Sequence, residues 1–183
     1  MLKAIYIWIY CVDFHEALIL LAAFTGLFYV AKVKLGQKRI WKIAVILVLL
    51  MWAASVIIQT IFHRTPDISL QPIWQPFQSY VDALKEGGQK ELLRSNFMNA
   101  VLFYPAGLLM ISLLPEKWHS LLKLLIVLIL FTGFSLSIEF AQYRYHLGLA
   151  QTDDVIHNAL GACLGAAFST HSKSYQPIKN PQK

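Results

Sequence analysis

The sequence predicts an all-α fold, a polytopic membrane helix bundle with about five transmembrane helices and a partly interfacial outer loop. Hydrophobic residues make up 57% of the 183 residues and charged residues only 14%, whereas soluble domains carry about 25% charged residues. The mean hydropathy is +0.53. Because so few charged side chains are available to cover a water-facing surface, we expect lipid to surround the chain. We expect one membrane domain over residues 1–170.

Five apolar segments are each close to the roughly 17–25 residues that a transmembrane helix needs. In chain order, we expect the spans at 4–31, 43–62, 97–114, 121–142 and 155–170. The second segment is uninterrupted, whereas the first contains Asp13 and Glu16. The third contains Pro105, which is expected to kink the helix or to interrupt its regular hydrogen bonding.

The fifth segment is the shortest and is rich in small residues, so hydropathy alone gives it weak support. Gly161 and Gly165 form a Gly-xxx-Gly pattern, which allows two membrane helices to approach closely. The same pattern also arises by chance in a stretch rich in Gly and Ala, and the sequence does not decide between these explanations. As a membrane helix, this segment is expected to pack inside the bundle.

The distribution of basic residues predicts the orientation. The segment 32–42 holds five basic residues and no acid, and 115–123 and the tail 171–183 are also basic, so the positive-inside rule places these three in the cytoplasm. The loop 63–96 and the connector 143–154 mix both signs and are expected outside. The result is an N-out, C-in topology with a disordered cytoplasmic tail. The formal charge of +6 lies at segment ends, which favours contact with anionic lipids and gives no reason to expect nucleic-acid binding.

The outer loop has sequence features of its own. Three prolines between Pro66 and Phe77 exclude a regular helix there. Apolar residues recur between 81 and 93 around a Gly-Gly pair. We expect two short amphipathic pieces lying on the bilayer surface.

Several polar side chains occur at membrane depth, where each ionised group costs roughly 2.5–3.5 kcal/mol and usually faces a bundle interior or a water-filled cavity. In the expected topology, the last three spans place carboxylate and amide groups at the outer end of the bundle. Spacings of three or four residues put the members of each pair on one helix face. The candidate site residues are Asn99, Glu139, Gln142, Asp154 and Asn158. Accessory candidates in the same leaflet are Asp13, Glu16 and Asp153.

Each of these groups also has a structural explanation. Asp153 and Asp154 are suited to capping the fifth helix, because acids favour a helix N-terminus. Asn99 and Asn158 are suited to hydrogen bonding between helices. His157 lacks a second ligand at fixed spacing, so a structural role is favoured over metal binding. We expect neither a metal site nor a cofactor.

Two blocks of sequence resemble the VanZ-like family of bacterial membrane proteins. The first matches the pattern Asn-xxx-Phe-x-Pro-x-Gly with Asn99, Phe103, Pro105 and Gly107. The second matches Glu-xx-Gln followed by Asp-xxx-Asn-xx-Gly-xxx-Gly, with Glu139, Gln142, Asp154, Asn158, Gly161 and Gly165. Many relatives carry an arginine where Gly148 lies and an acid where Gln151 lies. Arg144 is a candidate substitute for that arginine, by proximity only.

The resemblance implies residence in the bacterial cytoplasmic membrane and a link to teicoplanin susceptibility, a cell-wall antibiotic phenotype. It does not imply a reaction. A transporter is the weakest option, because the five short spans show no inverted repeat. Two other hypotheses therefore remain open. One is a non-enzymatic factor, which is favoured, that binds an envelope lipid, a lipid-linked cell-wall precursor or an envelope protein. The other is an intramembrane enzyme that uses Glu139 and Asp154 on a lipid-linked substrate.

Overall fold

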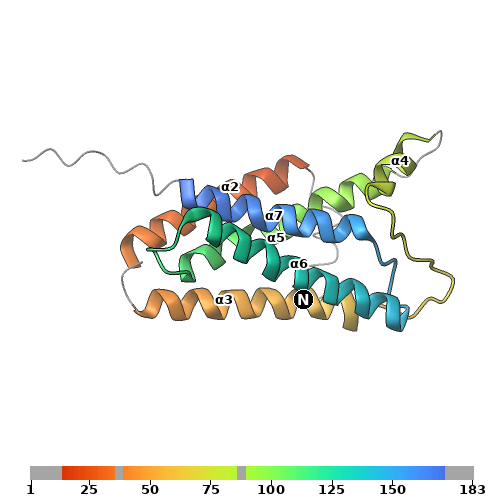
Figure 1. Ribbon diagram of the computed structural model, residues 1–183, viewed down its shortest axis with the longest axis horizontal. Helices are drawn as coiled ribbons and strands as arrows, with labels where there is room; N and C mark the ends of the chain where they lie inside the picture. Colours follow the sequence, from red (N-terminus) through yellow and green to blue (C-terminus); the bar gives the residue numbers. More distant parts are fainter. Residues whose placement is uncertain (1–13, 36–38, 86–89, 172–183) are drawn as a thin grey trace, which may run out of the picture.

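The computed structural model describes residues 14–35, 39–85 and 90–171, which form an elongated bundle of helices (Figure 1). The helices are α2 (Phe14–Leu35), α3 (Arg39–Ile57), the π-helix η1 (Ile58–Phe62), α4 (Gln78–Leu84), α5 (Lys90–Leu113), α6 (Ser120–Tyr145) and α7 (Thr152–His171). The described ranges contain no strand, only an isolated bridge between Ile73 and Gln151. The predicted all-α class is therefore confirmed.

Four of the helices are long and apolar enough to cross a membrane. They are His15–Leu35, Arg39–Phe62, Leu93–Leu113 and Ser120–Tyr145. Their outward faces carry large apolar side chains, such as Leu47 and Leu50 on α3, which are 55% and 61% exposed. In water such surfaces would aggregate, whereas lipid solvates them. The predicted first span begins at residue 4, and its first ten residues lie outside the described part of the chain, as does the tail from residue 172.

Helix α7 corresponds to the predicted fifth span and is not among these four. It lies within the bundle, packed mainly on α5 and also on α6 (Figure 1). Its inward face consists of small residues, among them Ala162 and Ala166, both fully buried. Burial against protein explains why the helix does not need the hydropathy of a lipid-facing span.

Three glycines allow α5 and α7 to approach each other closely. A Cβ atom on Gly107, Gly161 or Gly165 would overlap a backbone carbonyl oxygen of the facing helix. The Gly-xxx-Gly pattern on α7 is therefore a packing feature and not a consequence of composition. The helix α5 continues through Pro105, although that residue has no N–H to donate to the preceding turn.

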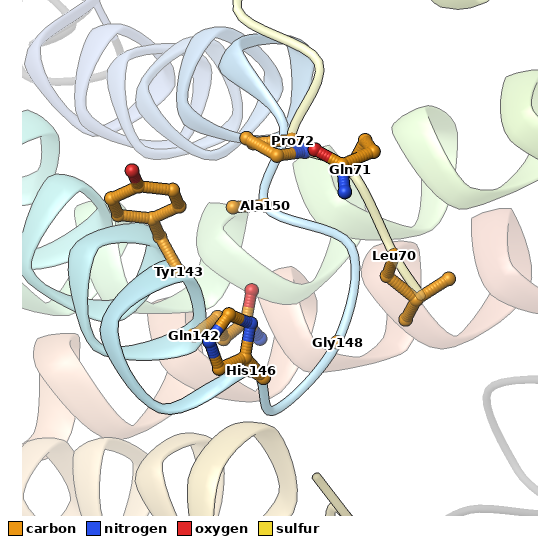
Figure 2. Close-up of a pocket in the computed structure, with 8 residues that line it drawn as sticks. All are labelled: Leu70, Gln71, Pro72, Gln142, Tyr143, His146, Gly148 and Ala150. Carbon is orange, nitrogen blue, oxygen red and sulfur yellow. The ribbon is translucent and has the colours of Figure 1, made fainter. Parts of the chain in front are cut away.

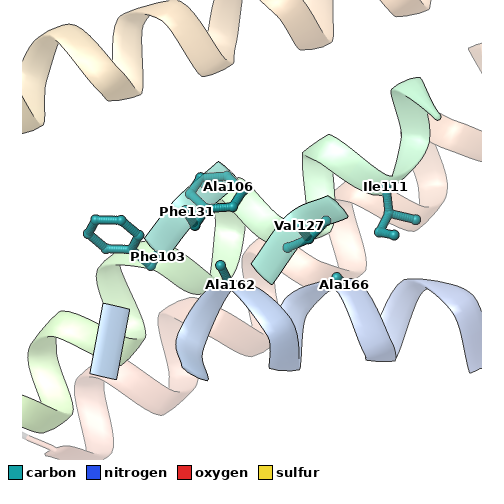
Figure 3. Close-up of a cluster of buried hydrophobic side chains, with 7 residues drawn as sticks. All are labelled: Phe103, Ala106, Ile111, Val127, Phe131, Ala162 and Ala166. Atoms are coloured by element: carbon teal, nitrogen blue, oxygen red, sulfur yellow. The ribbon is translucent and has the colours of Figure 1, made fainter. Parts of the chain in front are cut away.

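A cluster of buried apolar side chains joins the three central helices. Figure 3 shows Phe103 of α5 and Phe131 of α6 close together above the small side chains of α7. The indole of Trp52 on α3 meets Phe103 edge-on, with ring centroids 5.0 Å apart. Its Nε1–H donates to the carbonyl of Leu102 at 3.0 Å, so the indole fixes α3 to α5.

The long loop between η1 and α5 docks on the start of α7. Backbone hydrogen bonds join Ile73 N to Ala150 O and Thr152 N to Ile73 O, at 2.9 and 3.0 Å. Of the two amphipathic pieces expected on the bilayer surface, the first corresponds to α4, and residues 86–89 lie outside the described part. One face of α4 is buried against protein, because Ser79 is completely inaccessible. We call this end of the bundle, where α5 begins and α6 ends, the loop end.

Candidate functional site

A cavity of about 120 Å³ lies at the loop end of the bundle, between η1, α5, α6 and α7. All five predicted candidate residues line it, namely Asn99, Glu139, Gln142, Asp154 and Asn158. They come from three helices, and the first and last of them, Asn99 and Asn158, are 59 residues apart in the sequence. The arrangement therefore depends on tertiary packing and not on local spacing.

Hydrogen bonds hold the two residues of α6 in place. The Glu139 side chain is only 4% exposed, and its Oε2 accepts from the Gln151 N–H at 2.8 Å. Gln142 Nε2 donates to the Thr60 carbonyl of η1 at 3.2 Å. These bonds fix α6 to the α6–α7 connection on one side and to the π-helix on the other.

The residues of α5 and α7 leave polar atoms without partners. Asn158 Nδ2 donates to Ser135 Oγ at 2.8 Å. Asn158 Oδ1, Asn99 Nδ2 and Asp154 Oδ1 are buried and make no hydrogen bond with the described residues. An unpaired buried polar atom costs about 1–3 kcal/mol, and a polar cavity needs only about 10–15 Å³ to hold a water. The cavity thus has both the room and the free hydrogen-bonding capacity for several waters or for a polar ligand group.

Arg64 supplies the cationic side chain of this cavity. It follows η1 by two residues and lines the same space as the two carboxylates. Its Nη1 lies 2.7 Å from the point that a Cβ on Gly148 would occupy. Gly148 has a φ of 144°, a conformation that side-chain-bearing residues rarely adopt. The glycine at this position therefore makes room for the guanidinium.

Arg64 was not among the candidates from sequence. Arg144, the candidate substitute for the missing family arginine, lies instead over the ring of Tyr145, at 5.7 Å from the centroid, and does not line the cavity. The available signal was the position of Arg64, two residues beyond an apolar span that ends on the same side as the polar cluster.

Neither Glu16 nor Asp153, two of the accessory candidates, lines the cavity. Glu16 is exposed on α2, away from the cavity, and Asp13 lies outside the described residues. Asp153 is 1% exposed and neither caps α7 nor faces the cavity. Its carboxylate accepts hydrogen bonds from the Phe77 N–H and from the N–H and hydroxyl of Ser79. It therefore anchors the loop.

His157 makes two close polar contacts. Its Nε2 lies 2.6 Å from the Tyr80 hydroxyl, and its Nδ1 lies 2.6 Å from the Asp153 carbonyl oxygen. The contact of Nε2 joins α4 to α7, and the contact of Nδ1 orients the ring on α7 itself. Among residues 14–35, 39–85 and 90–171, no three His, Cys, Asp or Glu side chains gather as metal ligands would.

A second hollow of about 180 Å³ lies beside the cavity (Figure 2). The loop residues Leu70, Gln71 and Pro72 form one side of it. On the other side lie Tyr143 and His146, at the end of α6. Gln142 belongs to both spaces, so the outer loop forms part of the surroundings of the polar cavity.

The cavity combines two carboxylates, one guanidinium and several amides. Carboxylate and amide oxygens accept hydrogen bonds from hydroxyl and amine groups, whereas a guanidinium binds phosphate or carboxylate oxygens. The set therefore suits a ligand group that has both donors and anionic acceptors.

Comparison with curated proteins found no match, and comparison with solved structures found none either. The family model described as VanZ/LLP1 matches residues 18–171. This range includes all the cavity residues and the three glycines between α5 and α7. The chain, with its four apolar membrane-type helices, therefore belongs to the VanZ/LLP1 family of membrane proteins.

Proposed function

We propose that the polar cavity binds the polar head of an envelope lipid or of a lipid-linked cell-wall precursor. The observation that carries this proposal is the convergence of five polar side chains from three helices on one cavity, where three buried polar atoms lack partners. Such an arrangement is expensive for folding alone, because unsatisfied groups at membrane depth destabilise the bundle. A ligand that supplies the missing hydrogen bonds offsets that cost.

The site is proposed to face the outside of the bacterial cytoplasmic membrane. The charges at the helix ends support this, because Lys32 and Lys34 at the end of α2 and Arg39 and Lys42 at the start of α3 lie at the opposite end of the bundle from the cavity (Figure 1). Lipid-linked wall precursors and teicoplanin-type glycopeptides meet at that face. A protein that binds such a precursor at that face changes susceptibility to these antibiotics. The same holds for a protein that binds an envelope protein handling the precursor.

The orientation is tested by cysteine labelling in intact cells, with Cys11 and Cys163 replaced by serine. Leu84→Cys on α4 is 88% exposed and is expected to react with an impermeant thiol reagent. Lys34→Cys, near the C-terminal end of α2, is expected to react only after permeabilisation. Labelling of Lys34→Cys alone in intact cells overturns the orientation.

The site is tested by Glu139→Gln and Asp154→Asn, which remove a negative charge at nearly constant shape. Each is expected to abolish any change in teicoplanin susceptibility that expression of the chain produces. Asp82→Asn is the matched control, because Asp82 lies away from the cavity lining and its partners are Lys85, in a surface ion pair at 2.5 Å, and Gln78 of the same helix, whose Nε2 donates to it at 2.9 Å. Such surface ion pairs contribute little to stability. If both cavity variants change teicoplanin susceptibility as much as the wild type does, at equal amounts of protein in the membrane, the result argues against the site.

The second candidate function is an intramembrane enzyme acting on a lipid-linked substrate. It is favoured by the presence of Glu139 and Asp154 in one cavity, since Glu139 accepts a backbone hydrogen bond and Asp154 Oδ1 does not have a partner. Two carboxylates in different environments can divide into an acid and a base. Purified protein is incubated with a labelled undecaprenyl-linked precursor, with and without Mg²⁺. Turnover that both variants abolish supports the enzyme, whereas binding without turnover supports the binding protein.

A further inference from the structure

The polar cavity has its cation at the mouth and its carboxylates in the interior. Arg64 lines the cavity and is exposed. Glu139 lines the same cavity and is only 4% exposed, and Asp154 Oδ1 is inaccessible. A ligand that matches this order has an anionic group at the mouth and a cationic group inside.

The two carboxylates of the cavity lack a cation of the protein in direct contact. Glu139 interacts electrostatically with Asp154 and with Arg64. In the part of the chain that the structure describes, however, no ion pair joins Arg64 to either carboxylate. Buried carboxylates are costly unless a cation or hydrogen-bond donors compensate them. The interior therefore favours a ligand group that carries a positive charge.

The free hydrogen-bonding capacity of the interior also favours a donor. Of the three unpaired buried atoms among the described residues, Asp154 Oδ1 and Asn158 Oδ1 are acceptors. Asn158 is 6% exposed, and its Nδ2 is already bound to Ser135 Oγ, so only its oxygen remains for a ligand. An ammonium has three donors and no acceptor, so it satisfies these oxygens and neutralises charge at once. A hydroxyl supplies one donor and no charge.

The size of the cavity limits the group that enters it. Its volume of about 120 Å³ corresponds to about four waters at about 30 Å³ each. An aminoethyl group is about the size of three waters and fits this space. An amino sugar is several times larger and does not fit.

Arg64 suits a phosphate at the mouth. It makes no hydrogen bond with the described residues, so its N–H donors remain for a ligand. A guanidinium binds phosphate oxygens through two parallel N–H donors. Arg64 follows the end of the span Arg39–Phe62 by two residues, which places it near the level of the lipid phosphates.

We propose that the cavity binds a phosphoethanolamine group, with the ammonium among Glu139, Asp154 and Asn158 and the phosphate at Arg64. The inference rests on the proposed function and specifies the head that is bound. The same group occurs in ethanolamine phospholipids and in free O-phosphoethanolamine. In the lipid, the head turns its amine into the bundle, while the acyl chains stay in the surrounding membrane.

The first test compares lipids that share their acyl chains and differ in the head. Full-length protein in detergent is incubated with dioleoyl phosphatidylethanolamine, phosphatidylcholine and phosphatidylglycerol, and native mass spectrometry measures the lipid retained. The choline head keeps the positive charge and loses the three donors, whereas the glycerol head has donors and no charge. The ethanolamine lipid is expected to be retained about fivefold better or more than either, because each charge-assisted hydrogen bond is worth more than that factor.

The source of the group is tested by calorimetric titration with free O-phosphoethanolamine and with inorganic phosphate. Binding of O-phosphoethanolamine alone, without a preference for the ethanolamine lipid, keeps the group and overturns its lipid source. Equal retention of the three lipids together with no binding of O-phosphoethanolamine overturns the inference. A lipid preference that EDTA abolishes overturns it as well, because a metal ion then occupies the carboxylates.

Variants assign the two halves of the group. Arg64→Gln removes the contact with the phosphate, which all three lipids share, so it is expected to lower the retention of all three and keep their order. Glu139→Gln and Asp154→Asn are expected to remove the preference for ethanolamine, and either one suffices if the other does not fold. Arg144→Gln and Asp82→Asn are the matched controls, since neither residue lines the cavity. An ethanolamine preference that survives in a folded carboxylate variant overturns the inference.

The design separates failure of this inference from failure of the proposed function. If the carboxylate variants lower the retention of all three lipids equally, the cavity binds a head and the ammonium assignment fails. If no cavity variant changes the retention of any lipid, the proposed function of the cavity fails as well.

Discussion

Replacing Gly161 with alanine places a Cβ where the carbonyl oxygen of Ala100 lies in the present packing of α5 and α7. The obstacle is backbone, so it cannot rotate away as a flexible side chain can. The two helices must move apart, and the contacts on both sides of this glycine loosen together. Gly133 and Gly26 provide matched controls, because a Cβ on either of them meets no atom within 4 Å.

The magnitude follows from two opposing contributions. Overpacking costs about 1–3 kcal/mol, and the upper end applies because backbone must shift. Alanine also gains up to about 1 kcal/mol over glycine within a helix. Both variants gain the second contribution, so they should differ by the overpacking cost alone, which is about 2–3 kcal/mol at the upper end of that range. At about 2–4 °C per kcal/mol for a chain of this size, the melting temperatures should differ by roughly 4–12 °C.

The assay is thermal unfolding in detergent, followed by the loss of the monodisperse peak in size-exclusion chromatography. Gly161→Ala is expected to melt below the wild type, and Gly133→Ala at or above it. If Gly161→Ala melts within about 2 °C of Gly133→Ala, less than one kcal/mol separates the two, and the account of close helix approach is refuted.

Two further predictions concern the loop end. Gly148→Ala introduces a Cβ that displaces Arg64 and strains a backbone with a φ of 144°. It should therefore reproduce the susceptibility phenotype of Arg64→Gln. The double variant should have no larger effect than either single variant. If Arg64→Gln changes susceptibility and Gly148→Ala does not, the prediction is wrong. Asp153→Ala removes the acceptor of the Ser79 amide, a hydrogen bond to a charged group worth about 1.5–3 kcal/mol. Hydrogen exchange at Ser79 should accelerate by about tenfold or more, since about 1.4 kcal/mol is a factor of ten, and an unchanged rate rules out this anchoring role.

The sequence was sufficient to predict the class of fold and to predict that the five polar candidates lie together at one end of the bundle. Apolar length located the helices, although α5 begins at Lys90 and not at residue 97. The difference arises because hydropathy marks the part of a helix that crosses lipid, whereas hydrogen bonding continues beyond it. Helical spacing placed Glu139 with Gln142 and Asp154 with Asn158, and the structure brings these pairs to one cavity.

Sequence reasoning could not decide where adjacent side chains point. Asp153 and Asp154 are neighbours on α7, and successive residues of a helix point about 100° apart. One carboxylate consequently anchors the loop and the other lines the cavity. The direction of each depends on how α7 is rotated against α5 and α6, which tertiary packing determines.

The π-helix η1 determines which residue after α3 reaches the cavity. Its backbone hydrogen bonds join residues five apart, as in the bond of 2.9 Å from His63 N to Ile58 O. The turn therefore contains one residue more than an α-helical turn. Arg64 follows this wide turn by two residues and lines the cavity. The cation of the cavity thus comes from the segment that leaves the π-helix, and the extra residue in the turn contributes to where that segment begins.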